Sequence, residues 1–359
     1  MPQAVACGFF IWPQRETAHQ PMIVVLKPNT PEGDITAVVE EIKRLNYEPR
    51  VLRGVELTVI AAIGDERTHS NLETLTVFPQ VDRVMPVQSR YKLVKRQVHP
   101  SNSVIQVDGR IPLGGKKLQV MAGPCSVESE NQLLSTAHAV KKAGATILRG
   151  GAFKPRTSPY EFQGLGEQGL KLLAKAKQET GLAVITELLS EQHAELVAEY
   201  ADILQIGTRN AQNFQLLIAA AKTGKPVLLK RGLSMRIEEW LLAGEYVIAN
   251  GNPNLMFCER GIRTFETYTR NTLDLAAIPI IKQESHCPIV IDPSQGAGRA
   301  DLVVAMCKGA VAMGADALLI EVHPNPAEAW SDGAQQLSLD GFAKLMETLN
   351  PFIAAAGRE

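Results

Sequence analysis

The sequence has few cysteines, few aromatic residues and almost no net charge, and each shortage excludes a class of protein. Its five cysteines are widely spaced in 359 residues and form no CxxC pair. They therefore argue against a disulfide framework and for a reducing compartment, and we expect a cytoplasmic protein. The formal net charge is −1, so nothing global indicates binding to nucleic acid or to an anionic membrane. No segment approaches the roughly 18 apolar residues of a membrane span.

The first 21 residues carry no recognisable signal. They lack a basic n-region, and the apolar run at 9–12 is too short for a signal peptide. We expect an extension over 1–21 and assign it no role.

Residues 22–90 show the pattern of a small α/β module. The predicted order is strand, helix, strand, strand, helix, strand, at 22–26, 31–46, 50–52, 57–63, 68–76 and 83–87. This βαββαβ order predicts a ferredoxin-like domain. No cluster in it looks catalytic, so binding or regulation is the expected role, with structural packing as the alternative.

The remainder of the chain repeats one unit. After a linker at 91–103, two short strands flank Asp108-Gly109, a strong hairpin signal. Apolar strand-like runs then alternate with helical patterns, at 118–122, 146–148, 183–186, 203–206, 226–229, 255–257, 288–291 and 317–320. Eight such units predict a (β/α)8 barrel over 104–359, headed by the hairpin, and a doubly wound sheet is the alternative.

Charged residues follow the predicted strands, where a core would reject them. The segment 148–159 alone places Arg149, Lys154 and Arg156 between an apolar strand and the next helix. The carboxyl ends of parallel barrel strands share one face, so six cations are expected to converge there: Arg149, Lys154, Arg156, Arg209, Lys230 and Arg260. Such charges repel one another unless anions lie between them, which predicts one highly charged substrate or two phosphorylated ones. A solvated basic loop is the alternative for 148–159.

A second group at the strand ends combines one soft and two hard potential ligands. Cys125, Glu321 and Asp332 could together hold a divalent metal. Taken alone, a cysteine at a strand end is more often simply buried.

These residues lie in motifs that resemble those of 3-deoxy-D-arabino-heptulosonate 7-phosphate (DAHP) synthases. The similarity is greatest to the bacterial type I beta branch, which carries an N-terminal ferredoxin-like regulatory domain. The motifs cover nearly the whole barrel in order, and they are GPCSVES, LRGGAFKPRTSPYEFQGLG, QIGTRNAQNF, PVLLKRG, CERGIRTFE, DPS and EVHPNPAEAWSDGAQ.

The resemblance implies a transferase that condenses phosphoenolpyruvate with erythrose 4-phosphate, the first step of the shikimate pathway of aromatic amino acid biosynthesis. It implies that phosphoenolpyruvate binds to Arg149, Lys154, Arg209, Lys230 and Arg260. Arg156 and Thr157 would hold the phosphate of the aldose. A divalent metal on Cys125 and its partners would polarise the aldehyde, and Lys154 is a candidate general acid.

One position departs from the family pattern. The family's metal ligands are Cys, His, Glu and Asp, and where DPSH is expected this chain reads Asp292-Pro293-Ser294-Gln295. Gln295 could ligate a harder ion, or three protein ligands plus water could hold the metal. Alternatively, metal-dependent catalysis is impaired. His286 and His323 are not expected to replace the missing ligand. We expect Mn²⁺ first, with Fe²⁺, Co²⁺ or Zn²⁺ as alternatives.

Two other functions remain open from the sequence. The first is an octulosonate 8-phosphate synthase that uses arabinose 5-phosphate, against which the KPRT element argues. The second is a paralogue that binds phosphoenolpyruvate without turning it over. The resemblance also implies that the ferredoxin-like domain binds an aromatic amino acid effector, commonly tyrosine or phenylalanine, and closes over the barrel mouth. It further implies a homo-oligomer, with a tetramer favoured.

Overall fold

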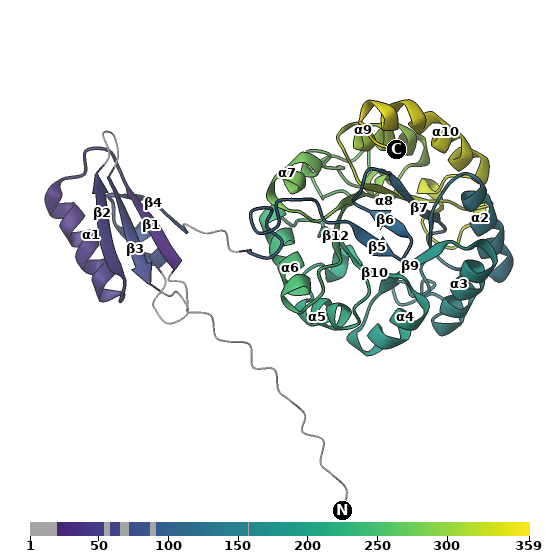
Figure 1. The fold of residues 1–359 in the computed structure, drawn as a ribbon, viewed down its shortest axis with the longest axis horizontal. Helices are drawn as coiled ribbons and strands as arrows, with labels where there is room; N and C mark the ends of the chain where they lie inside the picture. The colour runs from purple at the N-terminus through teal and green to yellow at the C-terminus, as the bar shows by residue number, and fades with distance from the viewer. Residues whose placement is uncertain (1–19, 54–57, 65–71, 87–90, 157) are drawn as a thin grey trace, which may run out of the picture. The chain divides into compact units, whose positions relative to one another are not determined.

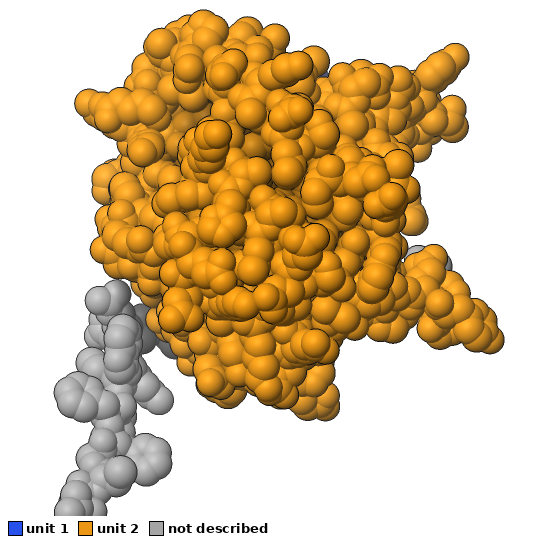
Figure 2. Space-filling model, turned by 90° about the vertical axis from the view of Figure 1, so that its right-hand side faces the viewer, with its two compact units in different colours: residues 1–90 blue, residues 91–359 orange. Residues whose placement is uncertain are grey.

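The computed structural model describes residues 20–53, 58–64, 72–86, 91–156 and 158–359, and these fall into two compact units, 1–90 and 91–359. Figure 1 shows the elements of both units, and Figure 2 shows the surface of the second unit in orange. The predicted extension lies almost entirely outside the described residues, and so does Thr157.

The first unit is a four-stranded antiparallel sheet with the strand order β2-β3-β1-β4, which confirms the ferredoxin-like prediction. Its elements are β1 (Gln20–Leu26), α1 (Glu32–Arg44), β2 (Glu48–Arg53), β3 (Thr58–Gly64), the 3₁₀ helix η1 (Leu72–Val77) and β4 (Val81–Pro86). Helix α1 buries Ile35, Val38 and Ile42, which belong to the same core as Val24 and Ile60 of the sheet. Acidic residues in the first turn of α1 and basic residues in its last turn favour the helix dipole. The second helix, predicted at 68–76, is the 3₁₀ helix η1 in its described part.

The second unit is a closed barrel of eight parallel strands surrounded by helices (Figure 1), as the sequence predicts. Its strands are β7 (Gln119–Gly123), β8 (Ile147–Arg149), β9 (Ala183–Leu188), β10 (Ile203–Ile206), β11 (Val227–Lys230), β12 (Leu255–Glu259), β13 (Ile289–Ile291) and β14 (Ala317–Glu321). Strand β14 pairs with β7 and closes the barrel. Most of these strands are buried on both faces, which is why they appear in the sequence as short continuous apolar runs.

The helices present their apolar faces to the barrel and share one core with it. They are α2 (Glu130–Lys142), α3 (Glu167–Thr180), α4 (Ala194–Tyr200), α5 (Phe214–Lys222), α6 (Ile237–Ala249), α7 (Ala277–Glu284), α8 (Pro293–Ala297), α9 (Ala300–Ala312) and α10 (Leu339–Ala355), with 3₁₀ turns η2 (Glu191–His193), η3 (Thr208–Asn210), η4 (Pro326–Glu328) and η5 (Gly333–Gln335). Helix α7 is not apparent from the sequence because Pro279 lies in it. At the third helical position a proline removes no intrahelical hydrogen bond, so the helix tolerates it. None of the described helices has the length and apolar character needed to cross a membrane.

A hairpin closes one end of the barrel. It consists of β5 (Ile105–Val107) and β6 (Ile111–Leu113), joined by Asp108, Gly109 and Arg110, of which the first two have positive φ angles, of 50° and 67°. Two successive positive φ angles are typical of a type I′ turn. The apolar side chains of the hairpin pack against the inward-facing residues of the strands. Contacts from Pro112 to Gln119 and from Ser103 to His286 place the hairpin at the amino ends of β7 and β13. The carboxyl ends are left for the site.

The segment 91–103, predicted as a linker, is packed against the barrel helices. The backbone N–H groups of Leu93 and Val94 donate to the Glu245 carboxylate of α6 at 2.8 and 3.0 Å. Arg96 donates to the carbonyl oxygen of Lys282 in α7 at 2.6 Å. These contacts make the segment part of the second unit.

Candidate active site

All six cations predicted to converge line one pocket at the carboxyl ends of the barrel strands. Arg149, Lys154, Lys230 and Arg260 are each at least 93% buried, whereas Arg209 is exposed on η3. Four buried cations in one pocket have no role in a hydrophobic core. The pocket is therefore built for anionic ligands.

The deepest cations are already paired with groups of the protein itself. Arg149 at the end of β8 forms a buried salt bridge with Glu321 at the end of β14. Lys230 Nζ lies 2.6 Å from Asp292 Oδ2. The electrostatic repulsion between the cations is thus relieved in part by carboxylates behind them, which the sequence did not indicate.

The Arg149–Glu321 pair is ionised on both sides. Burial alone would raise the pKa of Glu321, but Arg149 and Lys154 outweigh burial and hold the pKa below its ordinary value. Burial alone would lower the pKa of Arg149, and the Glu321 carboxylate more than offsets it, so this pKa is raised. Glu321 is therefore a carboxylate and not a carboxylic acid at neutral pH.

Arg156 has an unsatisfied donor. Its Nε donates to the carbonyl oxygen of Phe162 at 2.9 Å, which fixes the guanidinium. Its Nη2 is buried and has no hydrogen-bond partner among the described residues. A buried unsatisfied donor costs about 1–3 kcal/mol, so the atom is best explained by a ligand oxygen.

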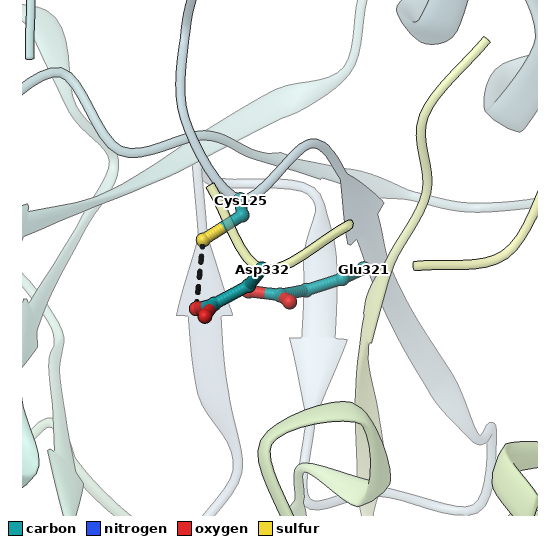
Figure 3. Close-up of side chains that lie close together, drawn as sticks. All are labelled: Cys125, Glu321 and Asp332. Atoms are coloured by element: carbon teal, nitrogen blue, oxygen red, sulfur yellow. Dashed lines mark hydrogen bonds between the residues drawn. The ribbon is translucent and has the colours of Figure 1, made fainter. Parts of the chain in front are cut away.

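The three residues predicted to bind a metal do lie together (Figure 3). Cys125 follows β7, Glu321 ends β14, and Asp332 lies in the loop after β14 with a left-handed φ of 51°. One potential ligand atom from each lies within 4.8 Å of the others. The Cys125 thiol donates to Asp332 Oδ2 at 3.3 Å. Burial raises the pKa of Cys125 to about 11, so the thiol keeps its proton when no cation is bound.

Gln295 lies beside this trio, in the short helix α8. Its backbone N–H is capped by Asp292 Oδ1 at 2.9 Å. Its amide nitrogen lies 3.1 Å from Glu321 Oε1 and 3.3 Å from Asp332 Oδ2, and its amide oxygen accepts a hydrogen bond from Arg260 at 2.9 Å. The side chain therefore connects the trio to the pocket cations.

Several pocket residues were not singled out from the sequence. Arg270 lies far from any strand end, in the loop before α7, and donates to Asp332 Oδ1 at 3.1 Å and to Gln335 Oε1 at 3.0 Å. Gln335 in turn donates to Glu321 Oε2 at 2.6 Å. Glu187, at the end of β9, is a carboxylate among the cations. The position of Glu187 at a strand end could have identified it from the sequence, whereas no sequence pattern marks Arg270.

A buried charge network supports the cations from behind. Arg231 Nη1 lies 2.9 Å from Glu259 Oε2 and 2.8 Å from Asp274 Oδ2, and its Nε donates to the Met235 carbonyl oxygen. Glu259 is completely buried, and its Oε1 accepts the Gly261 N–H at 2.6 Å. The network joins the ends of β11 and β12, so it holds Lys230 and Arg260, which are adjacent to it in sequence, in register.

Comparisons with known proteins identify the family to which the chain belongs. A family model described as "DAHP synthetase I family" matches residues 102–354, and one described as "DAHP synthase ferredoxin-like domain" matches residues 22–89. A phospho-2-dehydro-3-deoxyheptonate aldolase of Thermotoga maritima is 49% identical over 338 residues, which is 94% of this chain and 99% of that protein. The crystal structure of a DAHP synthase from the same organism superposes with a TM-score of 0.86 at 48% identity, covering 95% of this chain and 99% of the other.

More distant relatives carry a different name. A 2-dehydro-3-deoxyphosphooctonate aldolase of Caulobacter vibrioides is 33% identical over 275 residues, which is 69% of this chain and 93% of that protein. The octulosonate enzymes thus share less of the chain at a lower identity.

Proposed function

The chain belongs to the DAHP synthetase I family, and from this premise we propose how its barrel carries out the family's reaction. The enzyme condenses phosphoenolpyruvate with erythrose 4-phosphate to give DAHP and phosphate. The observation that supports this best is the single pocket lined by all six predicted cations. Octulosonate synthesis fits less well, because the relatives named for it cover only 69% of the chain at 33% identity.

Phosphoenolpyruvate binds, in this proposal, to Arg149, Lys154, Arg209, Lys230 and Arg260. Its phosphate and carboxylate groups need several donors, and guanidinium groups recognise both in a bidentate manner. Burial of four of these cations and their pairing with carboxylates support the assignment, since such side chains are held in place before the substrate arrives.

The phosphate of erythrose 4-phosphate binds to Arg156 and Thr157. The unsatisfied Nη2 of Arg156 supports this assignment. Because Nε is fixed by the Phe162 carbonyl oxygen, the guanidinium keeps its orientation without a ligand. Arg156 precedes Thr157 in the chain and follows Lys154 by two residues, so the two substrates lie next to each other.

The residues present fit a divalent metal. A thiol and two carboxylates with ligand atoms within 4.8 Å of one another offer the soft and hard donors that Mn²⁺, Fe²⁺, Co²⁺ or Zn²⁺ accept. We propose Cys125, Glu321 and Asp332 as the holding residues and Mn²⁺ as the physiological ion, because two of the three donors are carboxylates. The ion supplies Lewis acidity that polarises the aldehyde oxygen of the aldose.

The protein's own residues then manage protons and charge. As C3 of phosphoenolpyruvate forms a bond to the aldehyde carbon, Lys154 donates a proton to the aldehyde oxygen. Its ammonium lies 3.0 Å from both Cys125 Sγ and the Cys125 carbonyl oxygen, which aim it at that place. Water adds to the cationic C2 and loses one proton to give a C2 hydroxyl. The C2–O bond to phosphate then breaks, phosphate leaves with the bridging oxygen, and the hydroxyl loses its proton to form the C2 carbonyl; both protons pass to solvent or to the leaving phosphate. Arg149 and Arg260 stabilise the anionic charge during these steps.

Turnover and metal dependence test this function. We expect chelator-stripped protein resupplied with Mn²⁺ to form the heptulosonate from both substrates, with one phosphate released per phosphoenolpyruvate consumed. Activity should disappear again with excess chelator, because the aldehyde is then not polarised. The measurements are phosphate release and product formation, with arabinose 5-phosphate as a competing aldose.

Three results would contradict the proposal. Undiminished turnover after exhaustive chelation would exclude a role of a metal in catalysis. Product from arabinose 5-phosphate in preference to erythrose 4-phosphate would indicate an octulosonate synthase. Binding of phosphoenolpyruvate without turnover with any divalent ion would indicate a non-catalytic paralogue.

The ferredoxin-like unit regulates the enzyme, and we propose tyrosine or phenylalanine as its effector. The match of residues 22–89 to the ferredoxin-like domain of DAHP synthases supports this role. We expect a saturating effector to lower the rate and to raise the thermal midpoint, because ligand at 100 times its Kd stabilises the folded state by about 2.7 kcal/mol. Leucine at the same concentration is the control. The proposal fails if tyrosine and phenylalanine leave both quantities unchanged.

We propose a homo-oligomer, with a tetramer favoured, in the cytoplasm. Members of this family are usually homo-oligomers, which supports the assembly. The four described cysteines are all free, which supports a reducing compartment. Light scattering gives the mass, and a value equal to the 39.1 kDa of one chain would contradict the oligomer.

A further inference from the structure

The orientation of the Gln295 amide is determined by charged neighbours. Its nitrogen donates to Glu321 and Asp332, and its oxygen accepts from Arg260. If the amide were reversed, its oxygen would face two carboxylates and its NH₂ group would face a guanidinium, so acceptor would meet acceptor and donor would meet donor. The oxygen is therefore directed to Arg260, away from the space between the carboxylates.

The amide leaves each carboxylate free to accept one more partner. An ionised carboxylate has about four acceptor positions. Glu321 Oε1 accepts from Arg149 and Gln295, and its Oε2 accepts from Gln335, so one position on Oε2 is open. Asp332 Oδ1 accepts only from Arg270 among the described contacts, so one position on Oδ1 is open. The Cys125 sulfur, one position on Glu321 and one on Asp332 are thus available to a cation without Gln295.

From these contacts we infer that Gln295 is a positioning residue and not a metal ligand. Its amide NH₂ group holds Glu321 and Asp332 at the spacing at which they take a divalent cation together with Cys125. Its carbonyl oxygen holds Arg260 in the phosphoenolpyruvate pocket. The inference rests on the proposed function for the identity of the metal and of the substrate, but its test does not require turnover.

The arrangement has a consequence for binding. The Gln295 side chain links both carboxylates of the metal trio to Arg260, a cation assigned to substrate binding. Its removal therefore weakens the binding of both the metal and phosphoenolpyruvate. Loss of a hydrogen-bonding group beside metal ligands typically lowers metal affinity 10- to 100-fold. Loss of the acceptor for Arg260 leaves this 94% buried guanidinium without its one side-chain partner among the described hydrogen bonds.

The experiment counts the water molecules on bound Mn²⁺ in the full-length protein by pulsed EPR in ¹⁷O-labelled water. Calorimetry on the same samples gives the Kd of Mn²⁺ and of phosphoenolpyruvate. We compare the wild type with Gln295→Leu, Gln295→His and Gln335→Leu. Gln335 is the matched control, because its amide also donates to Glu321 but does not reach Asp332 or Arg260.

We expect Gln295→Leu to keep the wild-type water number, to raise the Kd of Mn²⁺ about tenfold and to raise the Kd of phosphoenolpyruvate. Gln335→Leu should weaken Mn²⁺ and leave phosphoenolpyruvate binding unchanged. Gln295→His should introduce a nitrogen coupling and remove one water, because an imidazole reaches a position that the amide oxygen does not occupy.

A gain of one water in Gln295→Leu would overturn the inference, since it would show that a ligand has been removed. A nitrogen coupling in Gln295→His with an unchanged water number would overturn it in the same way, and this variant serves if the leucine variant fails to fold. Equal phosphoenolpyruvate affinity in wild type and Gln295→Leu would refute the role toward Arg260. If water numbers and affinities behave as expected but no DAHP forms, the inference stands and the proposed function falls.

Discussion

Replacing Lys154 by methionine is expected to lower kcat by roughly 10³-fold, because a positioned general acid contributes about 10²–10⁴-fold. Burial and the neighbouring Arg149 lower the pKa of Lys154, but Cys125, Glu187 and Glu321 together outweigh them, so the pKa is raised and the side chain carries a proton to donate. Methionine keeps the length of the side chain and removes the proton. The measurement is kcat with both substrates and Mn²⁺ saturating.

Two control variants separate proton donation from binding. Lys154→Arg restores the positive charge without a readily lost proton, so phosphoenolpyruvate binding should recover more than kcat does. Lys230→Met removes another buried cation that we assign to binding alone, and it should raise KM for phosphoenolpyruvate more than it lowers kcat. A Lys154→Met enzyme with kcat near that of the wild type would show that another group donates the proton.

The Arg231→Leu variant is expected to be about 3–5 kcal/mol less stable than the wild type, because it leaves Glu259 buried without its cation. Glu259 is fully buried, and burial raises its pKa even with Arg231 beside it. Chemical denaturation followed by fluorescence measures the difference. Substrate affinity should fall with stability, since Lys230 and Arg260 flank this pair in sequence.

The loss of stability should depend on pH with a defined sign. Without Arg231, the folded-state pKa of Glu259 rises further above its value in the unfolded chain. The unfolded state then releases the proton at a lower pH than the folded state, so the destabilisation grows as the pH rises from the acidic range toward neutrality. A deficit that shrinks with rising pH would contradict this account.

A double variant and a surface variant serve as controls. Arg231→Leu with Glu259→Leu leaves no buried charge of the pair, so it should recover part of the lost stability. Arg299→Leu removes an exposed pair with Asp301, whose side chains are 47% and 62% exposed, and should cost far less stability than Arg231→Leu. Equal stability of Arg231→Leu and Arg299→Leu would show that the buried pair contributes no more to the free energy of unfolding than the exposed pair does.

The elements that the sequence predicts well are those whose signal is local. The eight strands are short apolar runs because both faces are buried, and the hairpin is marked by Asp108-Gly109, which accepts positive φ angles. The pocket cations could be found because parallel strands bring their carboxyl ends to one face. The helix containing Pro279 was less accessible, because a proline fits a helix only in its first turn and no capping residue marks where this helix begins. The pattern of Leu72–Val77 indicated a helix without showing that it would be of the 3₁₀ type.

The sequence by itself determined the barrel, the ferredoxin-like unit and the set of cations, because periodicity and strand-end position are properties of neighbouring residues. Only the tertiary structure decided which carboxylates compensate Arg149 and Lys230. Arg149 and Glu321 are 172 residues apart, and Lys230 and Asp292 are 62 apart. The same is true of Gln295, whose sequence position suggests a ligand while its neighbours direct its oxygen to Arg260. Electrostatic energy depends on distances of a few ångströms in space, and a linear pattern does not contain those distances.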